Sequence, residues 1–121
     1  SRVPGGGHLI INSRHRDERK RGRGVSHSFD FGRTWSKVTF DAQLIGPECQ
    51  GSLAKLGDFL FFSNDRSRAS RWPLTIQRSD NNGTTWARRL VVMSTGHFGY
   101  GSMVPQVLGE GQGGILYECG K

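Results

Sequence analysis

"SFDFGRTW", residues 28–35, returns 51 residues later as "SDNNGTTW", residues 79–86. Ser, Gly, Thr and Trp occupy the same positions in both copies, and Asn81 stands where Asp30 stood. Repetition with a period of about 50 residues is typical of folds built from repeated supersecondary units. The chain is therefore predicted to contain a recurring structural unit.

The repeated stretch has the chemistry of a tight turn between two strands. We expect the carboxylate of Asp30 to accept hydrogen bonds from nearby backbone N–H groups, and Gly32 to adopt the positive φ that such a turn requires. Thr34 is expected to close the turn through its hydroxyl, and Trp35 to enter the next strand as a large buried anchor. These residues are predicted to fix hairpins and not to perform chemistry themselves.

Apolar stretches on both sides of the turns indicate a series of short strands. The clear candidates are residues 8–12, 58–64, 73–79, 87–93 and 113–118, and the weaker ones are residues 23–28 and 36–40. Each turn lies between two of these strands, which is hairpin architecture. Gly contributes 18 of 121 residues, and no long capped amphipathic helix is visible. We predict an all-β fold of antiparallel meanders, of the kind that forms β-propeller blades.

Composition narrows the class of protein further. A chain with 34% hydrophobic and 22% charged residues suits one small packed domain. No apolar run reaches the roughly 20 residues that cross a bilayer, and the first residues lack the features of a signal peptide. Cys49 and Cys119 lack the spacing of a zinc site, so they could either pair or remain free.

The net charge of +7 makes a polyanion-binding module one alternative. Much of the excess lies in residues 13–24, "SRHRDERKRGRG". No aromatic residue interrupts this run, so a solvated arginine-rich loop is the simpler interpretation. Binding of RNA or heparin through it would require steeply salt-dependent affinity. No nucleic-acid partner is expected.

The repeated turn resembles the Asp box, S-x-D-x-G-x-T-W, of sialidases (neuraminidases), which fold as six-bladed β-propellers. Further segments resemble the same family in the same order, namely "GGGHLIINSR", "PECQGSL", "FFSNDRSRASRWPLTIQRS", "GYGSM" and "LYE". The resemblance extends over nearly the whole chain. It implies that residues 1–121 are the C-terminal part of a sialidase catalytic propeller, closest in character to the animal lysosomal type, with Asp boxes (BNR repeats) at 28–35 and 79–86.

The resemblance also assigns candidate site residues. Arg14 and Arg71 match two of the three arginines that bind the sialic acid carboxylate, a role that suits the two parallel hydrogen bonds of a guanidinium. Tyr100 matches the catalytic tyrosine, a nucleophile already known for sialidases. A neutral phenol can approach an anomeric carbon that bears its own carboxylate, whereas an anionic nucleophile would be repelled. Glu118 resembles the glutamate that supports an arginine of this site, although an ordinary acid at a strand end is an equal alternative.

Part of the machinery that the resemblance implies has no match in the chain. Glu48 receives no catalytic role, because the family's activating glutamate precedes the strand that leads to Arg14. That glutamate, the aspartate acid/base and the first arginine are expected N-terminal to Ser1 if the chain is a piece of a longer protein, and the alternative is that the chain is a decayed remnant. At about 50 residues per repeated unit, 121 residues make roughly two and a half blades. A closed propeller takes four to eight blades, so this number would leave strand edges open. The isolated chain is therefore expected to be inactive.

The implied function is that of an exo-α-sialidase, which hydrolyses terminal sialic acids of glycoproteins, glycolipids and oligosaccharides with retention, ganglioside catabolism included. No metal or organic cofactor is implied, the partners are sialylated glycoconjugates, and no membrane span is expected. The alternative is a non-catalytic Asp-box propeller that binds glycans or proteins. A glycosylation sequon at Asn82 favours the lysosomal or secretory route, with the cytoplasm as the other location.

Overall fold

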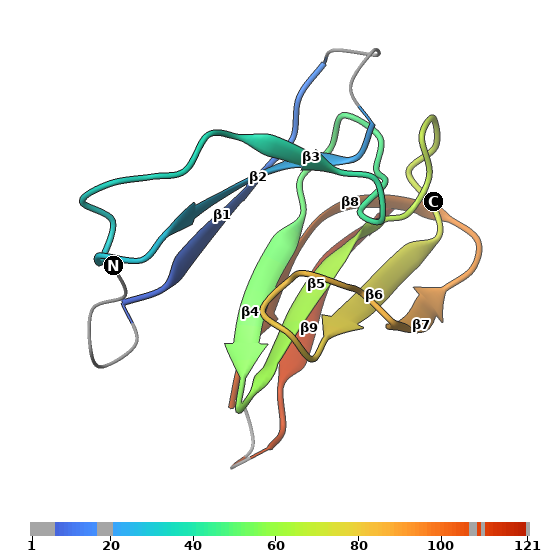
Figure 1. The fold of residues 1–121 in the computed structure, drawn as a ribbon. Coiled ribbons are helices and arrows are strands. Elements are labelled where there is room, and N and C mark those ends of the chain that lie inside the picture. Colours follow the sequence, from blue (N-terminus) through green and yellow to red (C-terminus); the bar gives the residue numbers. More distant parts are fainter. Residues whose placement is uncertain (1–6, 17–20, 107–108, 110, 121) are drawn as a thin grey trace.

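The computed structural model describes residues 7–16, 21–106, 109 and 111–120, and every regular element within them is a β-strand. The strands are β1 (Leu9–Ser13), β2 (Arg23–Ser28), β3 (Thr39–Asp41), β4 (Ser52–Leu56), β5 (Phe59–Asp65), β6 (Leu74–Ser79), β7 (Arg88–Met93), β8 (His97–Val104) and β9 (Gly114–Gly120). They form antiparallel sheets in the orders β1-β2-β3, β4-β5-β6-β7 and β8-β9 (Figure 1). The predicted all-β fold of antiparallel meanders, with partial blades around one four-stranded sheet, is confirmed.

Three findings bear on the other sequence-based expectations. Residues 17–20, within the arginine-rich run, lie outside the described residues. Over the described part of the chain, no helix is long and apolar enough to cross a membrane. Cys49 is buried and Cys119 is exposed, and both are free thiols.

All the stretches predicted as strands do form strands, with shifts at their ends, but β4 and β8 were not predicted. Their sequences, SLAKL and HFGYGSMV, lack the run of β-branched residues that marks a strand. Pairing with a neighbour holds each of them in place, since β4 pairs with β5 over its whole length and β8 pairs with β9. Tertiary pairing thus overrides weak local propensity here.

The predicted turn chemistry is confirmed in both copies. In the first turn, the N–H and the hydroxyl of Thr34 donate to the Asp30 carboxylate at 2.9 and 2.6 Å, and these bonds lower the pKa of Asp30 to about 2. Gly32 has the expected positive φ of 84°. In the second turn, Oδ1 of Asn81 accepts from the N–H of Thr85 at 2.8 Å, and its Nδ2 donates to the hydroxyl of the same residue. An uncharged amide therefore reproduces the geometry of the carboxylate.

The prediction that Trp35 is a buried strand residue is wrong. Trp35 lies outside the strands and is 39% exposed, and within the described residues its indole N–H donates to the Gly32 carbonyl of its own turn at 3.0 Å. Its counterpart Trp86 is 7% exposed and donates to Oδ2 of Asp41 on the preceding sheet at 3.2 Å. The first turn belongs to the sheet β1-β2-β3, and the described residues contain no earlier sheet on which Trp35 could pack as Trp86 packs on this one.

The core lies where the second turn meets the first sheet. Its buried members are Leu44, Leu60, Phe62 and Trp86, with Ile10 and Leu53 packed against them. Phe62 and Trp86 meet edge to face, with their ring centroids 6.1 Å apart, a favourable aromatic arrangement. The side chain of Gln43 joins the two sheets, because it accepts from the N–H of Trp86 at 3.1 Å and donates to the carbonyl of Thr84 at 3.2 Å.

Candidate functional site

The linker of residues 45–50, between the first and second sheets, ties the end of β1 to β8. Nη1 of Arg14 lies 3.4 Å from the carbonyl oxygen of Glu48, and Nη1 of Arg23 donates to the carbonyl of Cys49 at 3.0 Å. Oε1 of Gln50 accepts from the N–H of Gly101, the neighbour of Tyr100, at 2.8 Å. The linker therefore holds the region of Arg14 and the region of Tyr100 in a fixed relation.

Tyr100 lies on β8 beside an irregularity in its pairing with β9. The register shifts between Phe98 and Gly101, and Tyr100 is 48% exposed. Its backbone N–H donates to Oε2 of Glu118 on β9 at 3.1 Å. Gly99 makes room for this contact, because a Cβ there would collide with the Glu118 carboxylate. A bulge of this kind re-aims the side chains beside it, and here it leaves the phenol accessible to solvent.

Arg71 lies on the loop that joins β5 to β6, and its side chain is exposed. The N–H of Arg66 donates to the carbonyl of Pro73 at 2.9 Å, which brings the two ends of this loop together. The carbonyl of Arg71 accepts from the N–H of Phe98 on β8 at 3.1 Å. The backbone of Arg71 is thus attached to the strand that carries Tyr100, two residues before it.

Arg23 is a buried cation at the start of β2. It is 6% exposed, its Nε donates to Oδ1 of Asn12, and its guanidinium lies 5.2 Å from the ring centroid of Phe62. Burial lowers the pKa of Arg23 to about 10, and the like charge of Arg14 adds to this effect against an opposing contribution from Cys49. The side chain still carries its charge at neutral pH. Arg23 is therefore a fixed, buried positive charge close enough to Arg14 for the two like charges to repel each other.

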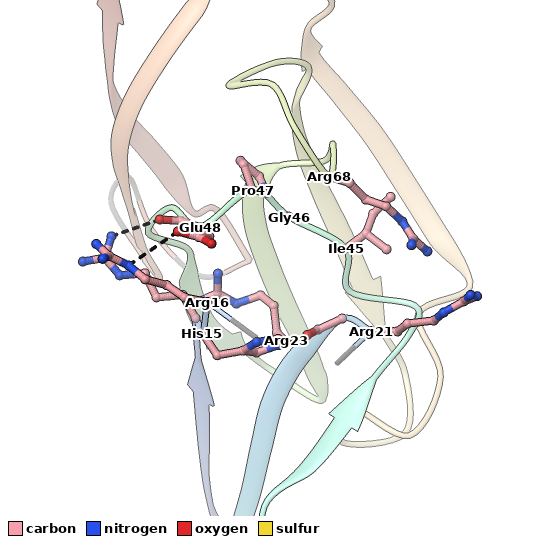
Figure 2. Close-up of a pocket in the computed structure, with 11 residues that line it drawn as sticks. His15, Arg16, Arg21, Arg23, Ile45, Gly46, Pro47, Glu48 and Arg68 are labelled. Carbon is pink, nitrogen blue, oxygen red and sulfur yellow. Dashed lines mark hydrogen bonds and ion pairs between the residues drawn. The ribbon is translucent and has the colours of Figure 1, made fainter. Parts of the chain in front are cut away.

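A cavity of about 320 Å³, which we call the arginine pocket, opens beside Arg14. Figure 2 shows its lining, which comes from the β1–β2 connection, the linker and the β5–β6 loop. Its charged lining residues are Arg14, Arg16, Arg21, Arg23, Glu48 and Arg68. Glu48 is the only acid among the described lining residues, so the pocket is strongly cationic.

Asp65 is a buried carboxylate that the sequence analysis missed. It ends β5, is 2% exposed, and neither carboxylate oxygen has a hydrogen-bond partner in the described structure. Burial raises the pKa of Asp65 to about 6, although the positive charges of Arg71 and His97 act in the opposite direction. The only sequence signal is that this acid stands where the segment "FFSNP" of sialidases has proline.

The predicted site residues are brought together only in part. Tyr100 contacts Glu118, and Arg71 is bonded to the same strand β8. Arg14 lines the arginine pocket, whose described lining includes neither Arg71 nor Tyr100. For Glu118, the hydrogen bond in the described structure is to the backbone of Tyr100, and no ion pair joins it to an arginine there.

A scan against protein-family models finds no match for the chain. Two curated proteins, both named sialidase, are 32% identical to it. The one from Micromonospora viridifaciens matches over 125 residues, 94% of this chain and 18% of its own length. The one from Bacteroides fragilis matches over 124 residues, 93% of this chain and 22% of its own length.

The fold agrees with these matches. The solved structure of "Hadza microbial sialidase Hz136" superposes with a TM-score of 0.74 at 30% identity, over 93% of this chain and 23% of that one. The chain belongs to the sialidase family. It spans about a fifth of the length of the sialidases that it matches.

Proposed function

We propose that this chain contributes to an exo-α-sialidase that hydrolyses terminal sialic acids of glycoconjugates with retention of configuration. The observation that carries the proposal is the position of Tyr100, an exposed phenol on β8 whose backbone is held by Glu118. In support of the proposal, the linker is bonded both to Arg14 and to β8, and the carbonyl of Arg71 is bonded to β8. Membership of the sialidase family supports the same reaction class.

Each residue has a chemical role in the proposal. The guanidinium groups of Arg14 and Arg71 bind the carboxylate of sialic acid through paired, charge-assisted hydrogen bonds. The phenol oxygen of Tyr100 attacks the anomeric carbon while its proton passes to a carboxylate base. Glu118 supports the backbone of Tyr100 through the 3.1 Å hydrogen bond.

The reaction needs two further groups. The aglycone leaves as an alcohol once an acid has protonated its oxygen, and water then displaces Tyr100 so that two inversions give net retention. Among the described residues, the Tyr100 hydroxyl has no hydrogen-bond partner, so we propose that base and acid come from other parts of the whole protein. No metal or organic cofactor takes part in these steps.

The test is Tyr100→Phe in the longest form of the protein that can be produced, with Tyr117→Phe on β9 as the matched control. We expect Tyr100→Phe to lower kcat on a fluorogenic sialoside by at least about 100-fold, because covalent catalysis is lost. Binding of free sialic acid, measured by calorimetry, should be unchanged. The control should keep its rate.

The outcomes separate the competing readings. An unchanged rate for Tyr100→Phe would remove this residue from the mechanism. Binding of sialosides by a wild-type protein that shows no turnover would instead favour the non-catalytic glycan-binding propeller.

A further inference from the structure

The arginine pocket holds more positive charge than the proposed reaction uses. Among its lining residues, Arg16 pairs with the single described acid, Glu48, at 3.4 Å, and both side chains are well exposed, at 90% and 52%. Arg14 is assigned to the sialic acid carboxylate. Arg23 is held by Asn12 and by the linker carbonyl of Cys49. These four therefore have either a structural partner or a proposed ligand.

Arg21 and Arg68 have neither. Both are exposed, and the described structure gives neither side chain a hydrogen bond or an ion pair. They come from different elements, since Arg21 precedes β2 and Arg68 lies on the β5–β6 loop. In Figure 2 both guanidinium groups lie on the opposite side of the pocket from the pair of Arg16 and Glu48.

The electrostatics of the pocket favour an anion at this position. Arg14 already acts on Arg23 as a like charge and, together with burial, lowers its pKa. Arg21 and Arg68 add exposed positive charge around the same cavity, and like charges that share one site repel one another unless an opposite charge is present. Guanidinium groups bind carboxylates and sulfates through charge-assisted hydrogen bonds. A bound anion would therefore offset repulsion that the described residues leave uncompensated.

We propose that Arg21 and Arg68 form a second anion subsite, which binds an acidic group on the leaving sugar, on the other side of the scissile bond from the terminal sialic acid. The inference rests on the proposed function, because it takes Arg14 as the ligand of the terminal sialic acid. A cavity of about 320 Å³ is at the small end of ligand pockets, so it suits one acidic sugar. A second sialic acid carboxylate and a sugar sulfate would both satisfy this chemistry.

The test compares three substrates in the longest form of the protein that can be produced. They are a disialyl α2,8-linked oligosaccharide, a sialyllactose that carries a sulfate on its galactose, and plain sialyllactose. We expect kcat/KM for the first two to exceed that for the third, and Arg21→Gln with Arg68→Gln to reduce this preference about five- to ten-fold. The effect should lie mainly in KM and should weaken in high salt.

Matched variants separate a binding role from a general change in charge. Arg33→Gln removes an exposed arginine on the first turn, away from the pocket, and should leave the preference intact. Arg68→Lys keeps the charge but loses the paired hydrogen bonds. It should therefore retain more of the preference for the acidic substrates than Arg68→Gln does. Because Arg21 and Arg68 are exposed, their replacement should leave the circular dichroism spectrum unchanged.

The two proposals fail in different ways. If plain sialyllactose is not hydrolysed, the proposed function is wrong. If it is hydrolysed but the acidic substrates gain nothing over it, or the double variant keeps their full advantage, the second subsite is refuted while the sialidase function stands. A preference for only one of the two acidic substrates would identify the carboxylate or the sulfate as the group that is bound.

Discussion

The two tryptophans that close the repeated turns allow a sharp test of what holds the sheets together. Trp86 and Trp35 occupy the same position in their turns, yet Trp86 is 7% exposed and Trp35 is 39% exposed. Replacing a buried tryptophan by alanine typically costs 3–5 kcal/mol. We expect Trp86→Ala to lower the free energy of unfolding by about 4 kcal/mol and Trp35→Ala by about 1 kcal/mol.

An intermediate variant separates packing from hydrogen bonding. Trp86→Phe keeps an aromatic ring against Phe62 but loses the indole N–H that donates to Asp41 at 3.2 Å. The carboxylate of Asp41 then loses one donor, so a cost of about 1–2 kcal/mol is expected in addition to the smaller ring. Trp86→Phe should therefore fall between wild type and Trp86→Ala.

The assay is urea unfolding of the chain followed by far-ultraviolet circular dichroism, since tryptophan fluorescence differs among these variants. The m-values show whether each variant unfolds from an equally compact state. Equal losses for Trp86→Ala and Trp35→Ala would refute the argument that the second turn, and not the first, is anchored on a preceding sheet.

Two further predictions concern Asp65 and Gly99 at the candidate site. The pKa of Asp65 is raised from 3.8 to about 6, so the folded state favours the protonated acid and stability should fall as pH rises from about 4 to above 6. The full shift corresponds to about 3 kcal/mol and solvent screening reduces it to about 1–2 kcal/mol; Asp65→Asn should remove this dependence in urea unfolding at pH 4.5 and 7.5, and an unchanged slope would contradict it. Gly99→Ala should cost about 1 kcal/mol in thermal unfolding, because its Cβ displaces the Glu118 carboxylate and breaks the hydrogen bond from the Tyr100 N–H. Gly101→Ala is its control, since there the nearest atoms lie at an ordinary 3.5 Å, and equal losses for the two alanine variants would contradict the steric argument.

What the sequence could predict is mostly local. The turn bonds of Asp30 and the positive φ of Gly32 depend on a few neighbouring residues, and both were predicted correctly. The exposure of Trp35 could not be predicted, because it depends on whether another sheet lies beside the turn. The strands β4 and β8 were missed for a related reason, since their partners and not their residue types make them strands.

The residues of the candidate site likewise fall into those that the sequence could indicate and those that only the fold reveals. Arg14, Arg71 and Tyr100 were found only through the family resemblance, and their roles stay a prediction. Asp65 gave a faint signal, as an acid at a proline position, but its burial became visible only in the fold. Arg21 and Arg68 line one cavity although 47 positions separate them in the sequence. No local sequence pattern could predict that they share it.

The linker of residues 45–50 also limits how this protein can change in length. The carbonyls of Glu48 and Cys49 contact Arg14 and Arg23, and the side chain of Gln50 contacts the strand of Tyr100. Inserting or deleting one linker residue would therefore shift these groups away from their partners. The hairpin at Gly57 is different, because an added Cβ there meets nothing within 4 Å and an insertion would extend into solvent. Loop grafts and affinity tags are therefore best placed at that hairpin, and the linker is where the spacing must be kept.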